Sequence, residues 1–370
     1  MQTWYIGLLS GTSADGIDAG LFRFDGNRCE TRATLTAPYP EALRRDLLEA
    51  IRNPARCTVD VVGALDTRIG ERFMTAAAGL LAKAGVESRQ VRAIGSHGQT
   101  LRHRPDARRP FTLQVGDPNI IAAGTGIVTV ADFRRRDLAL GGEGAPLACA
   151  FHREFLASPD EARAVVNIGG IANVTVLPAG DTKVTGFDTG PGNTLLDAWI
   201  GRHREQPYDP EGEWAAQGRC VRSLLDALLR DPYFGRPPPK STGFEHFNLG
   251  WLDEVLQDGW AAARAEDVQA TLAALTARTI GDAVRKRAPE TARVLVCGGG
   301  VHNRDLMRRL REELAPLPVS STMDFGVDPD WVEAATFAWL AGRCLDGLAG
   351  NLPEVTGATR ETILGGVWYP

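Results

Sequence analysis

The chain has 370 residues, of which 44% are hydrophobic and 24% charged, and its formal net charge is -5 at pH 7. This composition is typical of a globular protein, and the acidic balance argues against a nucleic-acid-binding surface. Because the chain is long for a single hydrophobic core, we expect two lobes.

The first predicted element is a hairpin around a turn of small residues. An apolar strand over 5–9 leads into the turn, and a second strand covers 19–24. Glycines allow a close approach of the backbone to a ligand, and the hydroxyls and amides of the turn suit phosphate oxygens. A Walker loop is excluded because Ile17-Asp18 stands where Lys-Ser would be required. A tight hairpin without a ligand is the alternative. The predicted phosphate contacts are Gly11, Thr12, Ser13, Ala14, Asp15, Gly16, Ile17 and Asp18.

The elements that follow complete lobe one. Apolar spacing predicts helices over 41–51, 59–84 and 119–124, and strands over 91–100, 111–115 and 127–131. We place lobe one at 1–133, joined by the C-terminal segment 346–370, and lobe two at 134–345.

Lobe two contains two more strands that end in glycines. They cover 164–176 and 293–303, and buried strands of this kind place glycine turns at one edge of a sheet. A long helix is predicted over 265–287, and another from Asp328-Pro329 to about 345, with Asp328 as N-cap. The predicted ligand contacts in these turns are Asn167, Gly169, Gly170, Gly298, Gly299 and Gly300.

Two kinds of segment are missing from the sequence. No apolar run is long enough to span a bilayer, and the N-terminus lacks a basic stretch followed by an apolar one, so we expect a cytoplasmic protein. The six cysteines lie far apart without a C-x-x-C pair, so we expect reduced thiols and neither zinc nor disulfides.

The ordered set of glycine turns resembles the layout of the sugar kinase, Hsp70 and actin superfamily. Seven motifs, in order, resemble more narrowly the anhydro-N-acetylmuramic acid kinase family. They are the segments 10–16 (SGTSADG), 95–100 (GSHGQT), 131–137 (ADFRRRD), 167–170 (NIGG), 186–193 (GFDTGPGN), 240–243 (KSTG) and 350–358 (GNLPEVTGA).

This resemblance implies an α/β fold of two RNase H-like lobes with mixed sheets flanked by helices and a ligand cleft between them, the actin-like ATPase fold. It implies an enzyme that uses ATP and Mg²⁺ to open the 1,6-anhydro ring of anhydro-N-acetylmuramic acid with water. The phosphate goes to O6 and gives N-acetylmuramic acid 6-phosphate, in cell-wall recycling. Members are typically homodimers. Asp15 and Asp18 could hold the metal ion through water.

The predicted catalytic residues are two carboxylates. Asp188 lies between an apolar segment and the turn 189–193, so it is our candidate for the base that activates water; capping of the helix that begins near Asn193 is the alternative. Glu333 matches the family's second acid near the sugar. A solvated first-turn glutamate is its alternative reading.

Four residues are predicted to contact the sugar. A guanidinium suits bidentate binding of the lactyl carboxylate of the substrate, and of Arg134, Arg135 and Arg136 we expect Arg136 to make this contact. His97 either positions the sugar or bonds a neighbouring loop, and Asp117 either holds the sugar or caps a helix. Asn193 follows from the family motif. A glycoside hydrolase using Asp188 and Glu333 without nucleotide, or a sugar sensor without turnover, are the rival functions.

Overall fold

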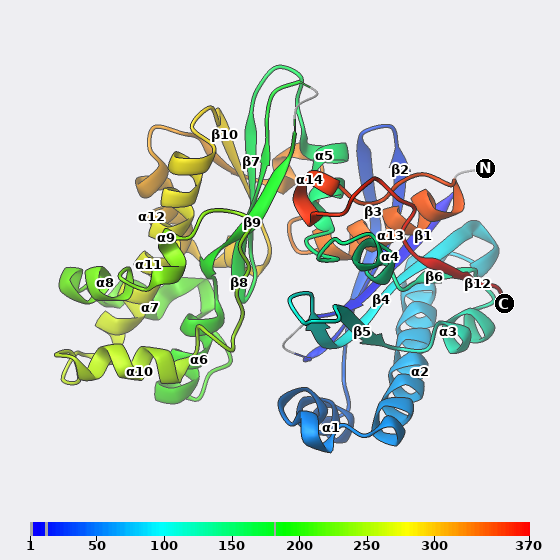
Figure 1. The fold of residues 1–370 in the computed structure, drawn as a ribbon, viewed down its shortest axis with the longest axis horizontal. Coiled ribbons are helices and arrows are strands. Elements are labelled where there is room, and N and C mark those ends of the chain that lie inside the picture. Colours follow the sequence, from blue (N-terminus) through cyan, green and yellow to red (C-terminus); the bar gives the residue numbers. More distant parts are fainter. Residues whose placement is uncertain (1–2, 12–13, 181–182) are drawn as a thin grey trace. The chain divides into compact units, whose positions relative to one another are not determined.

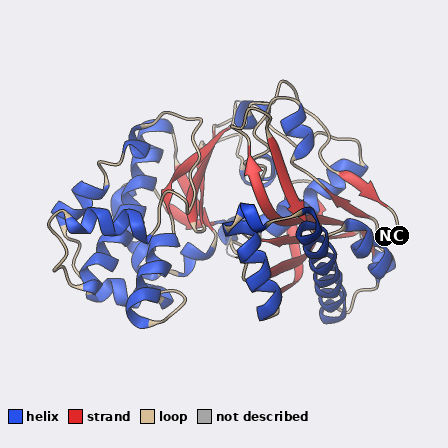
Figure 2. Cartoon of the chain, turned by 60° about the horizontal axis from the view of Figure 1, so that its bottom comes forward, coloured by secondary structure: helices blue, strands red, loops and turns tan. Residues whose placement is uncertain are grey.

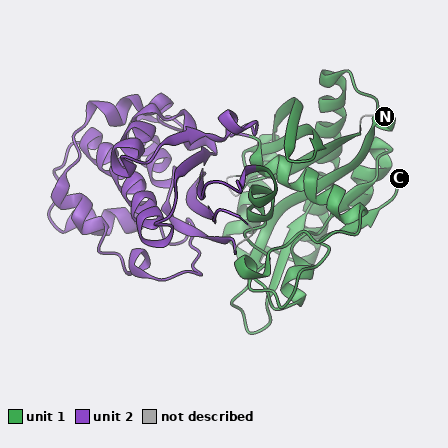
Figure 3. Cartoon of the chain, turned by 90° about the horizontal axis from the view of Figure 1, so that it is seen from above, with its two compact units in different colours: residues 1–155, 331–370 green, residues 156–330 purple. Residues whose placement is uncertain are grey.

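The computed structural model describes residues 3–11, 14–180 and 183–370. The chain forms two compact units: unit 1 is residues 1–155 with 331–370, and unit 2 is residues 156–330 (Figure 3). Residues 134–155 and 331–345 therefore belong to unit 1, whereas the sequence analysis assigned them to lobe two. Among the described residues, no helix has the length and apolarity that a membrane crossing requires.

Unit 1 is built on a mixed sheet with the strand order β12-β6-β4-β1-β2-β3, and β5 pairs with β4 (Figure 1). Strand β2 runs antiparallel to its neighbours β1 and β3, while β4 is parallel to β1 and β6 is parallel to β4. The strands are β1 (Trp4–Ser10), β2 (Gly16–Asp25), β3 (Arg28–Pro38), β4 (Val91–Arg104), β5 (Phe111–Val115), β6 (Thr129–Ala131) and β12 (Gly366–Trp368).

The helices of unit 1 cover both faces of this sheet. The 26-residue helix α2 begins after the N-cap Thr58, ends at Gly85 in the left-handed conformation, and buries a stripe of apolar side chains against the sheet. The helices are α1 (Glu41–Arg52), α2 (Val59–Ala84), α3 (Pro118–Thr125), α4 (Arg135–Ala139), α5 (Ala148–Leu156), α13 (Val332–Leu345) and α14 (Pro353–Thr356).

Helix α13 lies unusually close to the sheet. A Cβ atom at Gly7 would lie 1.8 Å from the carbonyl oxygen of Ala334, and one at Gly95 would lie 1.9 Å from that of Phe337. These two glycines on β1 and β4 are therefore required by packing. Their consequence is that Glu333, in the first turn of α13, is held at a fixed place against unit 1.

Unit 2 repeats the strand order of unit 1. Its sheet runs β9-β8-β7-β10-β11, with β7, β8 and β9 antiparallel and with β10 and β11 parallel to β7. Each unit thus has three antiparallel strands followed by parallel ones, which is the RNase H-like order, and the predicted α/β fold of two such units with mixed sheets flanked by helices is confirmed. The strands are β7 (Arg163–Ile168), β8 (Ile171–Leu177), β9 (Thr185–Pro191), β10 (Arg293–Cys297) and β11 (Val319–Ser321).

Figure 2 shows the helices and strands of the chain in different colours. In unit 2, buried apolar side chains of the helices form two cores. One core packs α11 and α12 on the sheet, and the other joins the N-terminal half of α11 to the shorter helices. The prediction of a helix over 265–287 is confirmed by α11. The helices are α6 (Thr194–Arg204), α7 (Glu213–Gln217), α8 (Arg222–Leu228), α9 (Pro232–Gly235), α10 (Leu249–Gln257), α11 (Ala265–Arg287) and α12 (Arg304–Leu314).

The predicted start of the last long helix was wrong. Helix α13 begins at Val332 with Trp331 as N-cap, four residues later than Asp328. The carboxylate of Asp328 instead accepts the backbone N–H of Asp330, and the carbonyl of Pro329 accepts the N–H of Gly298. This long-range bond holds the segment before α13 in a non-helical path.

Candidate active site

In unit 2, Asp188 lies on β9 and is held by a loop rather than by a helix end. Its carboxylate accepts the backbone N–H of Thr242 at 3.0 Å, its own N–H donates to the carbonyl of Lys240, and its carbonyl accepts the hydroxyl of Tyr233. The N-cap of α6 is Asn193. The capping alternative for Asp188 is therefore wrong.

The surroundings of Asp188 are cationic and partly desolvated. The Lys240 ammonium lies 4.4 Å from the ring centre of Tyr233 and donates to the Tyr233 carbonyl. Burial lowers the pKa of Lys240, and burial together with the nearby Asp188 charge raises the pKa of Tyr233. The hydroxyl of Thr242 is buried without a hydrogen-bond partner in the described structure. A positive charge and an orphaned hydroxyl beside a carboxylate suit a polar, anionic ligand.

Asp188 is part of a row of polar side chains across the sheet. It pairs with Asn173 on β8, which pairs with Asn167 on β7. The neighbouring row of Phe187, Val174 and Val166 belongs to the core beneath α11, so the polar row lies on the opposite face. Sequence analysis did not identify Asn173. A polar residue in a largely apolar strand, at the position that pairs with Asn167, could have indicated it.

The two glycine turns predicted in unit 2 come together with Asn193. A Cβ at Gly298 would lie 2.3 Å from the side-chain oxygen of Asn167, and one at Gly299 would lie 3.9 Å from the amide nitrogen of Asn193. Asn193 also donates to the carbonyl of Ile168. The residues that share this edge of the sheet are Asn167, Gly169, Gly170, Asn193, Gly298, Gly299 and Gly300, and glycine turns of this kind allow a phosphate or nucleotide to approach the backbone closely.

In unit 1, the first hairpin is present as predicted, but Thr12 and Ser13 lie outside the described residues. The Ser10 hydroxyl donates to the carbonyl of Gly16, and the Gln99 amide donates to that of Gly11. A Cβ at Gly16 would lie 2.6 Å from the carbonyl oxygen of Ala37, so packing alone already requires this glycine.

The predicted metal residues take part in protein contacts. Asp15 pairs with Arg44 at 2.6 Å, and Asp18 accepts the hydroxyl of Thr36 at 2.8 Å. No group of three or more metal-ligating side chains occurs within 3–11, 14–180 and 183–370. Mg²⁺ is usually held by one or two carboxylates with water and substrate phosphates, so the two aspartates fit such an arrangement, although not a protein cage.

A second cluster in unit 1 joins His97, Arg134 and Glu333. The Nε of Arg134 donates to Nε2 of His97 at 2.9 Å, and Nη1 of Arg134 donates to the carbonyl of Gly144 at 2.7 Å. Phe337, one turn after Glu333 on α13, packs on the His97 ring at 4.5 Å between centroids. His97 is thereby fixed between Arg134 and helix α13, which also carries Glu333.

The charges in this cluster influence one another. Burial lowers the pKa of Arg134 to about 10, and the nearby Glu333 charge acts in the opposite direction. Glu333 keeps access to solvent, yet the protein atoms crowded around it raise the pKa of its carboxyl, which the Arg134 charge opposes. The charge of Asp18 adds to the rise. Glu333, Arg134 and Asp18 thus belong to one electrostatic group.

Both ring nitrogens of His97 contact protein groups. Nε2 accepts from Arg134, so Nδ1 carries the proton and donates to the carbonyl of Gly98 at 3.1 Å. This geometry corresponds to the loop-bonding alternative for His97, and leaves the histidine neutral. Sequence reasoning favoured Arg136 over Arg134, because three consecutive arginines give no signal of which one bonds to His97.

We expect His97 to make the stability of the protein dependent on pH. Burial and the Arg134 charge lower the pKa of His97 well below its usual value, so below about pH 6.5 only the unfolded chain binds a proton there. The free energy of unfolding should therefore fall as the pH is lowered from about 7 to about 5. The fall should be smaller in His97→Gln, and the difference between the two proteins should be up to about 1.4 kcal/mol per pH unit. Urea unfolding at both pH values tests this. Equal losses in the two proteins would contradict it.

Unit 1 also contains a cavity of about 160 Å³ beside His97. Its lining includes polar groups: the Ser96 hydroxyl is buried without a partner in the described structure, and burial raises the pKa values of Asp66 and Asp132. The cavity can therefore accept a small polar ligand group. Its lining includes Asp66, Ser96, His97, Asp132, Arg135 and Trp368.

The other predicted sugar contacts do not line this cavity: Asp117 and Arg136 belong to unit 1 but are absent from its lining, and Asn193 belongs to unit 2. The Asp117 carboxylate caps α3 by accepting the N–H and the side-chain amide of Asn119 at 2.8 Å, which is its structural alternative. Arg135 lines the cavity and lies 3.5 Å from Asp132. Arg136 is exposed on α4. The three arginines therefore differ in their contacts: Arg134 is bonded to His97, Arg135 is exposed but lines the cavity beside Asp132, and Arg136 is exposed and absent from the cavity lining.

Two RNase H-like units with glycine turns at the ends of their strands define the class of two-lobed proteins that contains actin and the sugar kinases. A family model described as "Anhydro-N-acetylmuramic acid kinase" matches residues 3–370. The chain belongs to the anhydro-N-acetylmuramic acid kinase family.

Relatives from several bacteria show the same match along the whole chain. A protein of Xanthomonas axonopodis pv. citri (strain 306) named "Anhydro-N-acetylmuramic acid kinase" is 52% identical over 369 residues, covering 99% of this chain and 98% of the relative. One of the same name from Coxiella burnetii (strain Dugway 5J108-111) is 49% identical over 366 residues, covering 99% and 97%. Among solved structures, component A of (R)-2-hydroxyglutaryl-CoA dehydratase from Acidaminococcus fermentans is 13% identical, with a TM-score of 0.48 and coverage of 91% and 96%.

Proposed function

We propose that this chain is an ATP-dependent kinase that opens the 1,6-anhydro ring of anhydro-N-acetylmuramic acid with water and phosphorylates O6. The observation that carries the proposal is Asp188, held by the loop 240–243 within a chain that matches the family along its whole length. We extend the proposal to a cytoplasmic homodimer that acts in peptidoglycan recycling.

The proposed reaction assigns Asp188 the role of general base. Its carboxylate removes a proton from water as the water oxygen bonds to the anomeric carbon, and the bond from that carbon to O6 breaks. O6 then bonds to the terminal phosphorus of ATP, and ADP leaves. Carboxylates of this kind contribute typically about 10²- to 10⁴-fold to the rate.

The remaining predicted residues take supporting roles in this proposal. The glycine turns of both units would bind the nucleotide through backbone amides, and Glu333 would act as a second acid beside the sugar. When bound, Mg²⁺ would neutralise phosphate charge, and Asp15 and Asp18 would hold it through water. His97, Asp117, Arg136 and Asn193 stay our proposed sugar contacts.

The test is an incubation with ATP, Mg²⁺ and the anhydro sugar in oxygen-18 water, followed by mass spectrometry and measurement of ADP. We expect one labelled oxygen at the anomeric carbon and one phosphate in the same product. Ring opening without ADP would support a glycoside hydrolase instead. Sugar binding without either product would support a sensor.

The arginine that binds the lactyl carboxylate can be identified by two matched substitutions. If Arg136 makes the contact, Arg136→Ala should raise KM about 10- to 100-fold with little change in kcat, since a charge-assisted bidentate bond is lost. Arg135→Ala is the comparison, because both arginines are exposed but only Arg135 belongs to the cavity lining. A rise in KM only for Arg135→Ala would move the contact to Arg135. Sugar analogues without the carboxyl group should not distinguish the wild type from the affected variant.

A further inference from the structure

The turn 190–194, which follows Asp188 on β9, is bonded directly to the glycine hairpin between β7 and β8. Three successive N–H groups of the turn donate to the carbonyls of Gly169 and Gly170, at 2.8 to 3.1 Å. A Cβ at Gly192 would lie 2.3 Å from the Gly169 carbonyl oxygen. The proposed base and the proposed phosphate hairpin are therefore separated by one short, tightly packed stretch of backbone.

The other side of this turn is held by a single buried hydroxyl. Thr276 of α11 is 1% exposed, and its Oγ1 lies 3.0 Å from the carbonyl oxygen of Pro191 and 3.1 Å from that of Gly192. One hydroxyl proton thus serves two adjacent peptide carbonyls. Neither carbonyl could turn away without losing this bond.

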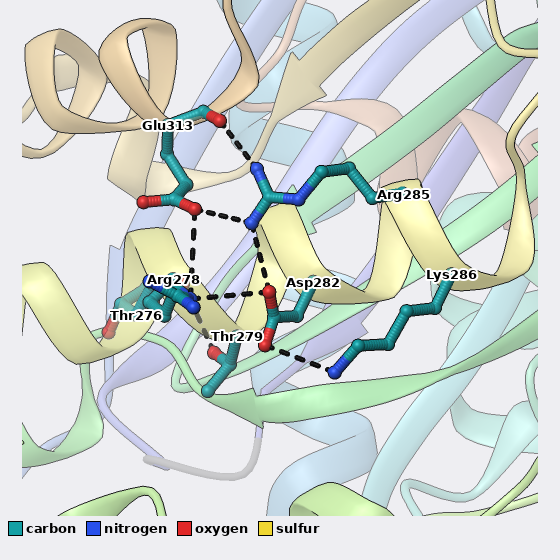
Figure 4. Close-up of polar contacts among 7 residues, drawn as sticks. All are labelled: Thr276, Arg278, Thr279, Asp282, Arg285, Lys286 and Glu313. Carbon is teal, nitrogen blue, oxygen red and sulfur yellow. Dashed lines mark hydrogen bonds and ion pairs between the residues drawn. The ribbon is translucent and has the colours of Figure 1, made fainter. Parts of the chain in front are cut away.

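Helix α11 is itself fixed at this point. Figure 4 shows Thr276 and Thr279 beside a network of charged side chains on α11 and α12. Asp282 accepts from Arg285 at 2.9 Å and from Arg278 at 3.2 Å, and both arginines pair with Glu313 of α12. The Thr276 hydroxyl is therefore presented from a helix that ion pairs hold on its outer side.

We propose that Thr276 is a positioning residue for the reaction. Its hydroxyl fixes the turn 190–194, so Asp188 and the Gly169–Gly170 hairpin keep a constant spacing while bond breaking and phosphoryl transfer take place. The inference rests on the proposed roles of Asp188 and of the hairpin. Geometry of this kind acts on kcat, because misplacement of a catalytic group raises the barrier without removing a contact to substrate.

Three substitutions of buried β-branched residues test the proposal. Thr276→Val keeps the shape and removes the hydroxyl, and Thr276→Ser keeps the hydroxyl. Thr279→Val is the matched control, because the hydroxyl of Thr279 donates to the carbonyl of Thr276 within the same helix α11. We expect kcat to fall roughly 10- to 100-fold in Thr276→Val with KM for both substrates within about threefold, and to recover in Thr276→Ser. Thr279→Val should keep kcat within about threefold of wild type.

Amide hydrogen exchange provides a measurement that does not depend on the reaction. Peptides that cover 186–196 should exchange faster in Thr276→Val than in Thr279→Val, while peptides of the β10 strand should not change. Faster exchange with unaltered kcat would overturn the positioning role, as would an equal loss of kcat in the two valine variants. If the wild type were inactive but the exchange pattern were as expected, the proposed function would be overturned. The conclusion that Thr276 holds the turn 190–194 would still stand.

Discussion

Replacing Asp188 with asparagine should reduce kcat by roughly 10³-fold, because an amide cannot accept the proton of the attacking water. The side chain keeps its shape and an oxygen that can accept the N–H of Thr242, so the loop 240–243 should stay in place. Nucleotide affinity should change by less than about threefold, since the glycine turns are untouched. Steady-state kinetics and calorimetric titration with ADP measure the two quantities.

The control for this substitution is Asp258→Asn, which removes an exposed carboxylate from the same unit. It should leave kcat unchanged. Substantial activity in Asp188→Asn would remove Asp188 from the role of base. A parallel loss of ADP affinity would show that the substitution disturbs the nucleotide turns instead.

Removal of the buried carboxylate of Asp137 should lower the free energy of unfolding of unit 1 by about 4 kcal/mol, and Tm by roughly 10 °C. Asp137 is 0% exposed and accepts three hydrogen bonds of 2.8 Å, from the N–H of Gly144, the amide of Asn351 and the hydroxyl of Thr356. Asp137→Ala would leave the buried N–H of Gly144 without this acceptor, and Asn351 and Thr356 would keep only their longer bonds of 3.3 Å to the carbonyls of Arg360 and Leu352. Calorimetry and urea unfolding measure the loss.

Two comparisons show whether the bonds themselves cause this loss. Thr356→Val removes one donor and should cost about 1 kcal/mol, and Asp106→Ala, an exposed aspartate, should have little effect. If Asp137→Ala were no less stable than Asp106→Ala, the three bonds would not stabilise the attachment of the segment 346–370 to α4.

Much of the local structure could be predicted from short-range patterns. The apolar spacing of 59–84 and 265–287 coincides with α2 and α11, because long amphipathic helices bury one stripe whatever their partners are. The prediction that a helix begins at Asp328-Pro329 was wrong, because the conformation of this segment depends on a hydrogen bond between Pro329 and Gly298, 31 residues earlier in the chain. The shared strand order of the two units was equally hidden, because register between distant strands leaves no local signal.

In the candidate site, too, the local features could be predicted and the contacts between distant residues could not. Glycine-rich strand ends identified the turns around Asn167, Gly170 and Gly298, whose backbone conformation is local. The side chains that surround the carboxylates were not found, since Arg134 and Thr242 are distinguished from their neighbours only by contacts in the folded chain: Arg134 is bonded to His97, and the Thr242 N–H is bonded to Asp188. Asn173 became visible only through its pairing with Asp188 across β8 and β9.

The division of unit 1 into two stretches of sequence bears on how the protein folds during synthesis. The ribosome completes unit 2, a continuous stretch of 156–330, before it releases α13 and β12, which unit 1 needs. We therefore expect unit 2 to reach its native state first, while the sheet of unit 1 exposes the face that α13 later covers. The nascent chain would then carry an uncovered apolar surface until its last elements emerge, which is the interval in which chaperones act.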